Sequence, residues 1–370
     1  MNILGLFGAF DWDVSTDDSI WSHDAGATLI SNGNHITSIS EERLTRIKYY
    51  GNFPSKSIEY CLSTGNLSHD DIDLVYVPTM PHAIWHKNVY EGKTQSQIQT
   101  LFPNCKIKFV SHHLCHAASS VFSCDFNEGT FITLDGRGGS LCRYNFEEIN
   151  NVETNSIGYF NKEKGIFRFF PGLENVNEFG NYYFSFAHVI YSQKMKKQFP
   201  LKDAISHSGK IMGLSAYGKN ESYRKEHDGY QLSKDLYCNS VPYVTFDFRS
   251  YDEQYKFKNL NEHAYILQKN FENALLDYLN ELKEKSYLEE NICFAGGCFL
   301  NVLANSLIQK SGLFNNIHIP PFPGDDGLSF GAACYAAFEH GITVNLPNNI
   351  ALLGKEYSQD DIEKELKKLL

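Results

Sequence analysis

The sequence predicts an α/β protein with two lobes, on three observations. The chain has 370 residues, more than one ordinary domain requires. A run of short β-prone segments opens the chain, and a similar run begins again near residue 130. Three expected strands run into glycine-rich turns followed by helices, at Asp135, Gly296 and Gly324. We therefore expect lobes over 1–128 and 129–350, each with an antiparallel unit followed by alternating helices and strands.

The first lobe shows its strands as short apolar segments separated by turn residues. Strands are expected over Asn2–Phe7, Ala27–Ile30, His35–Ser40, Asp73–Val77 and Lys106–Val110. The turn sequence SNGN at 31–34 predicts a hairpin between the second and third of them. A helix is expected after Pro54, because proline favours the first turn of a helix.

The second lobe repeats this pattern and adds a long helix. Strands are expected over Thr130–Asp135, Leu141–Tyr144, Ser156–Phe160, Asn291–Phe294 and Asn316–Ile319. Apolar residues keep helical spacing from Leu260 to Leu282, which predicts an amphipathic helix with a packing role. A last helix is expected over Leu328–Phe338, with Asp326 as its capping residue.

The composition argues against a nucleic-acid-binding, membrane-spanning or secreted protein. The net charge of −11 argues against a surface devoted to nucleic acid. No apolar run approaches the ~20 residues that span a bilayer, and the N-terminus lacks the basic region of a signal peptide. Nine cysteines form no CxxC pair, which indicates reduced, buried thiols. We expect a cytoplasmic protein without a membrane partner.

The segment SHHLCHAASS at 111–120 is the most informative for chemistry. It places His112 and His116 one helical turn apart on one face, where two imidazoles bind one metal ion if further ligands arrive. Alone, so short a pattern more often marks ordinary helix histidines. Asp135 ends a buried strand at the glycine-rich turn LDGRGG, which offers a carboxylate beside exposed backbone amides.

The two-lobed plan resembles the architecture of actin, Hsp70 and the sugar kinases. This resemblance implies a nucleotide and metal cleft between the lobes, with two glycine turns and an adenosine loop. Each strand–glycine–helix junction puts a helix N-terminus where phosphate binds.

Eight motifs across the chain point to one family. In order they are HDAGA (23–27), EERLTRIK (41–48), GNFP (51–54), SHHLCHAASS (111–120), LDGRGG (134–139), GKIMGLSAYG (209–218), FAGGCFLN (294–301) and PFPGDDGLSFGAA (321–333). They resemble the O-carbamoyltransferases, the family of the nodulation-factor, cephalosporin and tobramycin enzymes. More distantly, the chain is similar to the tRNA threonylcarbamoyl-transferring proteins.

The resemblance implies a divalent ion held by His112, His116 and Asp325, with Asp135 close by as a catalytic residue. Such a ligand set suits Fe(II), with Mn(II) or Mg(II) as alternatives. His23 matches the family's N-terminal histidine, whose imidazole suits proton transfer from an attacking hydroxyl. The alternative for His23 is a strand-end histidine bonded to the backbone.

The resemblance also implies contacts to ATP or carbamoyl-adenylate. Arg43 and Lys48 match the cationic part of EERLTRIK and are expected to hold phosphate or carbamoyl oxygens, Arg43 as a catalytic residue and Lys48 as a cofactor contact. The alternative is a solvated charge run. The remaining expected contacts are Gly136, Gly138, Lys210, Gly296, Gly297 and Asn301.

The expected function is therefore transfer of a carbamoyl group to a hydroxyl of a small molecule, sugar or nucleotide. The donor is carbamoyl-adenylate made from carbamoyl phosphate and ATP. Alternatives are threonylcarbamoyl transfer to tRNA, and a nucleotide-binding scaffold without turnover. Residues 351–370 are expected to begin an adenylate-forming domain. Either the chain is a fragment of a longer protein, or a separate partner supplies the rest of that domain. An insertion at 11–22, with Trp12 and Trp21, is expected to contribute to acceptor recognition, with simple hydrophobic packing of the two tryptophans as the alternative.

Overall fold

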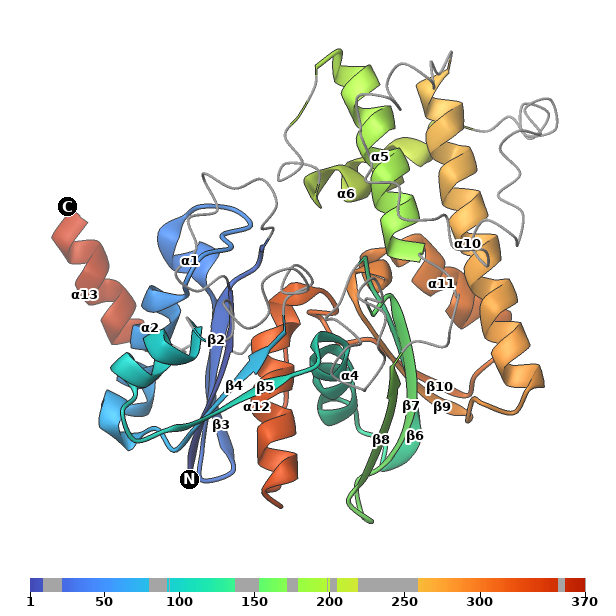
Figure 1. The fold of residues 1–370 in the computed structure, drawn as a ribbon. Coiled ribbons are helices and arrows are strands. Elements are labelled where there is room, and N and C mark those ends of the chain that lie inside the picture. The colour runs from blue at the N-terminus through green and yellow to red at the C-terminus, as the bar shows by residue number, and fades with distance from the viewer. Residues whose placement is uncertain are drawn as a thin grey trace.

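The computed structural model describes residues 1–8, 22–79, 92, 94–136, 153–171, 179–197, 199, 205–218, 259–351 and 357–369. It contains two five-stranded mixed sheets, one in each lobe (Figure 1). The predicted two-lobed fold of the actin, Hsp70 and sugar-kinase type is confirmed.

The first sheet has the strand order β3-β2-β1-β4-β5. The strands are β1 (Asn2–Phe7), β2 (Gly26–Ser31), β3 (Asn34–Ser40), β4 (Leu74–Pro78) and β5 (Lys106–Val110). The first three are antiparallel, and β4 and β5 run parallel to β1. The helices of this part are α1 (Glu41–Thr45), α2 (Ser55–Gly65) and α4 (His112–Ser123). All five expected strands are present with ends within one residue of the prediction.

The second sheet repeats the same pairing in the order β10-β9-β6-β7-β8. Its strands are β6 (Glu128–Leu134), β7 (Asn155–Asn161), β8 (Ile166–Pro171), β9 (Asn291–Ala295) and β10 (Asn316–His318). The strands β6, β7 and β8 are antiparallel, and β9 and β10 run parallel to β6. Sequence reasoning missed β8, whose apolar run does not alternate strictly. The expected strand Leu141–Tyr144 lies outside the described residues.

Three helices pack together above the second sheet: α5 (Phe179–Met195), α6 (Ile205–Ser215) and α10 (Leu260–Glu284). The predicted helix 260–282 is confirmed, and its apolar face, including Phe271 and Leu275, lies in the core of this lobe. The chain also forms α11 (Val302–Ser311), α12 (Leu328–Glu339) and α13 (Gln359–Leu369). None of the helices in the described ranges has both the length and the apolarity that crossing a bilayer requires.

Two helices, α4 and α12, pack against each other between the two sheets (Figure 1). The helix α12 packs on α4 and on the first sheet, and α4 also packs on β6 and β9 of the second sheet. Glycines permit this close approach: a Cβ at Gly5 would collide with the Ser329 carbonyl, and one at Gly331 with the Cys115 carbonyl. The expected cap of α12 by Asp326 is wrong, because Gly327 occupies the N-cap and no side chain caps the helix.

Candidate metal centre and interlobe cleft

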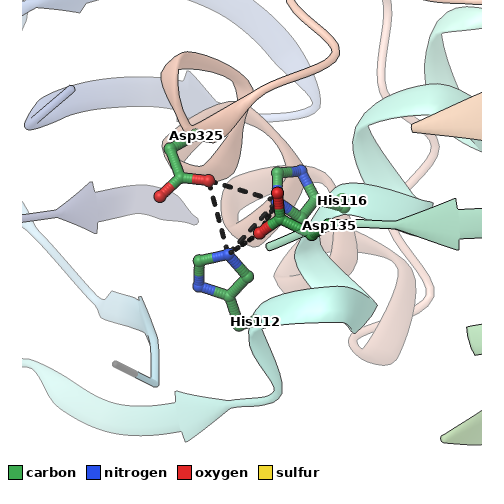
Figure 2. Close-up of side chains that lie close together, drawn as sticks. All are labelled: His112, His116, Asp135 and Asp325. Carbon is green, nitrogen blue, oxygen red and sulfur yellow. Dashed lines mark hydrogen bonds and ion pairs between the residues drawn. The ribbon is translucent and has the colours of Figure 1, made fainter. Parts of the chain in front are cut away.

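The candidate metal centre lies where α4 and α12 begin. The helix α4 starts directly after β5, with Ser111 as its N-cap accepting a hydrogen bond from the Leu114 N–H. Its first two turns carry His112 and His116. Asp135 follows β6, and Asp325 opens the short 3-10 turn that leads into α12. Figure 2 shows the four side chains pointing toward one another.

The ligand atoms of these four side chains all lie within 4.8 Å of one another. The Nε2 atom of His112 lies 3.2 Å from Nε2 of His116, 3.3 Å from Oδ2 of Asp135 and 3.4 Å from Oδ1 of Asp325. The Nε2 atom of His116 lies 3.3 Å from the same Asp325 oxygen and 3.7 Å from the Asp135 oxygen. Atoms about 2 Å from a common cation are spaced in this way.

The charge of the centre favours a cation. Burial lowers the pKa of His112, but the charge of Asp325 and the bond to Asp135 outweigh it and raise that pKa to about 10. Burial raises the pKa of Asp135, but its bonds to the two histidines hold it well below the usual value. Two carboxylates thus hold protons on neighbouring imidazoles, and a divalent ion would take the place of those protons.

The donor set fits a divalent transition metal. Two imidazoles with carboxylates suit Fe(II) and Mn(II), and no feature of the four ligands selects one metal. Only the Nε2 atoms face the centre. The Nδ1 atoms of His112 and His116 are buried and, within the part of the chain that the structure describes, have no hydrogen-bond partner.

Gly296 and Gly297, whose expected contact with the nucleotide stays a prediction, also support Asp135. The Gly297 N–H donates to Oδ1 of Asp135 at 3.0 Å, which leaves Oδ2 for the centre. Gly296 adopts φ +98°, and a Cβ there would collide with the Leu134 carbonyl. Its N–H donates to the Pro323 carbonyl at 2.7 Å. The glycine pair therefore lets the ends of β9 and β6 approach closely.

Glu153 anchors the N-terminus of α4, a role that sequence reasoning missed. Its carboxylate is fully buried. It accepts the Ser111 hydroxyl at 2.5 Å and the His113 N–H at 3.2 Å. A carboxylate at a helix N-terminus also stabilises the helix dipole. Glu153 thereby holds the turn that presents His112.

His23 lies beside the centre. Its Nδ1 is 2.8 Å from Oδ2 of Asp24, and its Nε2 is 3.7 Å from Oδ2 of Asp325. Burial lowers the pKa of His23, but Asp325 and Asp24 raise it to about 9. The Asp24 bond orients the ring so that Nε2 faces Asp325.

A cavity of about 460 Å³ opens above the centre, between the lobes. It brings together most residues expected in the site: His23, Arg43, Lys48, Asp135, Gly136, Gly297, Asn301 and Asp325. Gly296, Lys210 and the two histidines of the centre, His112 and His116, do not line it. The Lys210 ammonium donates to the Ser206 hydroxyl at 2.9 Å and lies 4.5 Å from the centre of the Tyr191 ring. Gly138 and insertion residues 11–21 lie outside the described residues, and Ser22 lines the cavity.

The two walls of this cavity differ in character. The second-lobe wall carries an apolar part, formed by Tyr183, Phe184, Ile205, Met212 and Phe271, beside polar side chains such as Asn181 and Ser208. The first-lobe wall is charged and includes Asp24, Glu42, Arg43 and Lys48. Arg43 is 73% exposed and 3.7 Å from Glu42, and the Lys48 ammonium lies 4.9 Å from the Tyr49 ring centre.

Asp326 stands at the same cavity, with its side chain exposed to it. Poor hydration in this deep cleft, together with the charges of Asp24 and Asp325, raises the pKa of Asp326 to about 7. Asp325 turns toward the histidines instead, so the adjacent aspartates face different surroundings.

Comparison with known proteins identifies the family of the chain. Residues 18–91 and 78–334 match the protein family described as carbamoyltransferase N-terminus. The chain belongs to this carbamoyltransferase family. Nodulation protein NolNO of Sinorhizobium fredii is 25% identical, covering 92% of this chain and 50% of that protein. The uncharacterised protein sll1178 of Synechocystis is 24% identical, covering 94% of this chain and 62% of that protein. The chain thus spans roughly half to three fifths of these curated relatives.

Solved structures support the fold. Full-length HypF in the phosphate- and nucleotide-bound form has a TM-score of 0.52 and 13% identity, covering 93% of this chain and 56% of that chain. HypF of T. kodakarensis has a TM-score of 0.51 and 14% identity, and the match covers 93% of this chain and 48% of that chain. At these identities the likeness concerns architecture alone.

Proposed function

We propose that the cleft transfers a carbamoyl group from carbamoyl-adenylate, the product of carbamoyl phosphate and ATP, to a hydroxyl of a small molecule, sugar or nucleotide. One observation carries the proposal. In a chain of the carbamoyltransferase family, His112, His116, Asp135 and Asp325 converge, and the two aspartates of this cluster line an interlobe cavity.

These four side chains would hold the divalent ion. When bound, the ion would act as a Lewis acid toward the carbamoyl oxygen, on which negative charge develops during attack. Gly297 fixes Asp135 through its N–H, and Glu153 fixes the first turn of α4. Both supports let the ligands keep their positions as substrates enter.

With the charge of Asp325 engaged by a bound cation, His23 would be neutral and would accept the proton of the attacking hydroxyl at its Nε2 atom. Asp24 holds the other ring nitrogen, so the ring keeps one orientation at the edge of the centre. Arg43 and Lys48, on the charged wall, would contact phosphate or carbamoyl oxygens, and the Gly136 backbone would lie beside them. Lys210 as a phosphate ligand stays a prediction, as does Gly138.

The apolar second-lobe wall would take the adenosine part of the donor. Aromatic side chains such as Tyr183 and Phe271 suit a purine ring. The acceptor would then approach from the first-lobe wall. Transfer to tRNA has less support, because the net charge of −11 opposes a polyanion.

The test is AMP release from carbamoyl-adenylate by the 370-residue chain loaded with Fe(II) or Mn(II). A panel of polyols, sugars and nucleosides serves as acceptors. His116→Ala should lower the metal-stimulated rate by about 100-fold or more, because a ligand of the ion is lost. His340→Ala, at the far end of α12, is the matched control and should keep the rate. Equal rates in wild type and His116→Ala would contradict the proposal.

A further inference from the structure

A chain of hydrogen bonds leads from the surface of α10 to the wall of the cavity. It comprises Lys269, Glu272, Gln268 and Asn301, which we call the amide relay. The Lys269 ammonium donates to Oε2 of Glu272 at 2.6 Å. The Nε2 atom of Gln268 donates to Oε1 of Glu272 at 2.9 Å and to Oδ1 of Asn301 at 2.9 Å. In return, Nδ2 of Asn301 donates to Oε1 of Gln268 at 3.0 Å.

The orientation of Gln268 is fixed by its partners. A carboxylate paired with an ammonium accepts hydrogen bonds and does not donate them, so the Gln268 atom facing Glu272 must be the NH2 group. The Gln268 oxygen also accepts the Tyr183 hydroxyl at 2.8 Å. Gln268 is 1% exposed, so water offers no alternative partner. A reversed amide would place two acceptors in contact at Glu272.

The orientation of Asn301 is fixed independently. Asn301 is the N-cap of α11, and its Oδ1 accepts the Ala304 N–H at 3.1 Å. A backbone N–H can only donate, so this atom must be the oxygen. The other partners of Gln268 and those of Asn301 therefore independently require the same assignment of donor and acceptor atoms in this pair. The side-chain oxygen of Asn301 accepts hydrogen bonds from Gln268 and Ala304. One of the two amide protons of Asn301 is donated to Gln268.

The second amide proton of Asn301 has no acceptor within the described part of the chain. Asn301 is 8% exposed and lines the cavity, so this proton is buried except toward the cavity. We infer that Gln268 is a positioning residue that makes Asn301 a hydrogen-bond donor toward the bound nucleoside. The ligand atom that meets Asn301 must then accept: a ribose oxygen or a ring nitrogen of the base.

The surroundings of Asn301 indicate the nucleoside part of a ligand. Tyr183 bonds the same Gln268, and Phe271 lies one helical turn after it on α10; both line the cavity. This inference rests on the proposed function, in which adenylate occupies the apolar wall. It adds the direction of one hydrogen bond and the residue that enforces it.

Calorimetry with ADP and with adenosine on the full chain tests the inference. Asn301→Asp keeps an oxygen to cap α11 but replaces the NH2 group. It should weaken both ligands about tenfold or more, since a buried acceptor on the ligand loses its donor. Adenosine is uncharged, so its loss of affinity cannot arise from repulsion between the introduced carboxylate and phosphate. Gln268→Met, which leaves Asn301 in place, should weaken adenosine about threefold to tenfold.

Two further variants guard against misfolding. Asn301→Ser also keeps a capping oxygen and puts no carboxylate against Gln268; it should weaken adenosine as Asn301→Asp does. Asn259→Asp changes the capping residue of α10, which does not line the cavity, and should bind both ligands as wild type does. Thermal melting monitors folding throughout.

The outcomes separate the two ideas. This inference is overturned, and the proposed function stands, if wild type binds ADP and the Asn301 variants bind adenosine within twofold of wild type. Wild type that binds neither ADP nor adenosine would overturn both. Tenfold loss in both Asn301 variants, with Asn259→Asp unchanged, supports the donor role.

Discussion

Replacing Gly296 with alanine should cost far more stability than the same change at another glycine of positive φ. Gly296 has φ +98° and ψ 158°, a region that only glycine adopts readily, which costs about 1 to 3 kcal/mol for another residue. The added Cβ would also collide with the Leu134 carbonyl. Overpacking of this kind adds about 1 to 3 kcal/mol. The sum is about 2 to 6 kcal/mol for Gly296→Ala.

Gly312 provides the matched control. It ends α11 at φ +68°, and a Cβ there meets nothing within 4 Å. Gly312→Ala therefore carries only the backbone penalty, about 1 to 2 kcal/mol. The difference between the free energies of unfolding of the two variants reports the steric cost at Gly296, where β9 approaches β6 closely.

Urea unfolding and metal content together form the assay. Moving the Gly296 backbone also moves the Gly297 N–H that holds Asp135 at 3.0 Å. Gly296→Ala should therefore bind a divalent ion more weakly, whereas Gly312→Ala should bind it as wild type does. If both variants lose equal stability and keep equal metal affinity, the glycine pair has no role in positioning Asp135, and the reasoning is wrong.

Two other predictions concern buried and half-buried carboxylates. Glu153→Gln should lower divalent-metal affinity about tenfold in a chelator competition, because Ser111 and the His113 N–H donate to different oxygens of Glu153, and one of these becomes an NH2 group in glutamine. Exposed Glu163→Gln is the control, and unchanged affinity in Glu153→Gln would contradict the role. Burial raises the pKa of Glu339, but bonds from Lys108 and Tyr76 hold it below its ordinary value of 4.5. The stability gained from Glu339 is therefore present above pH 4.5 and lost as the pH falls through the lower folded-state pKa, and Glu339→Gln should flatten this part of the pH–stability curve. An unchanged curve would contradict it.

Local patterns in the sequence predicted most of the fold and the residue types of the centre. The strands of the first sheet have their own turns and apolar runs, and the i,i+4 spacing of His112 and His116 is visible within one helix. Gly296 and Gly297 were assigned to the nucleotide, which stays a prediction. Their contact with β6 was not predicted, since it appears only after folding.

What the sequence did not reveal depends on distant pairs. Glu153 meets Ser111 across 42 positions, and Asn301 meets Gln268 across 33. Neither Glu153 nor Gln268 has a recognisable signal in the local sequence, because a buried glutamate or glutamine has the same sequence context as an exposed one. The Asp326 cap was wrong for a related reason: a 3-10 turn places Gly327 at the N-cap of α12 and leaves Asp326 at the cavity.

Anomalous diffraction at the iron or manganese edge tests the central claim most directly. Crystals of the 370-residue chain, loaded with Fe(II) or Mn(II), should show one strong anomalous peak between His112, His116, Asp135 and Asp325, at about 2.0 to 2.3 Å from their ligand atoms. Crystals of His116→Ala treated in the same way should lose that peak. No peak among these side chains in the loaded wild type, or an equal peak in the variant, would contradict the account.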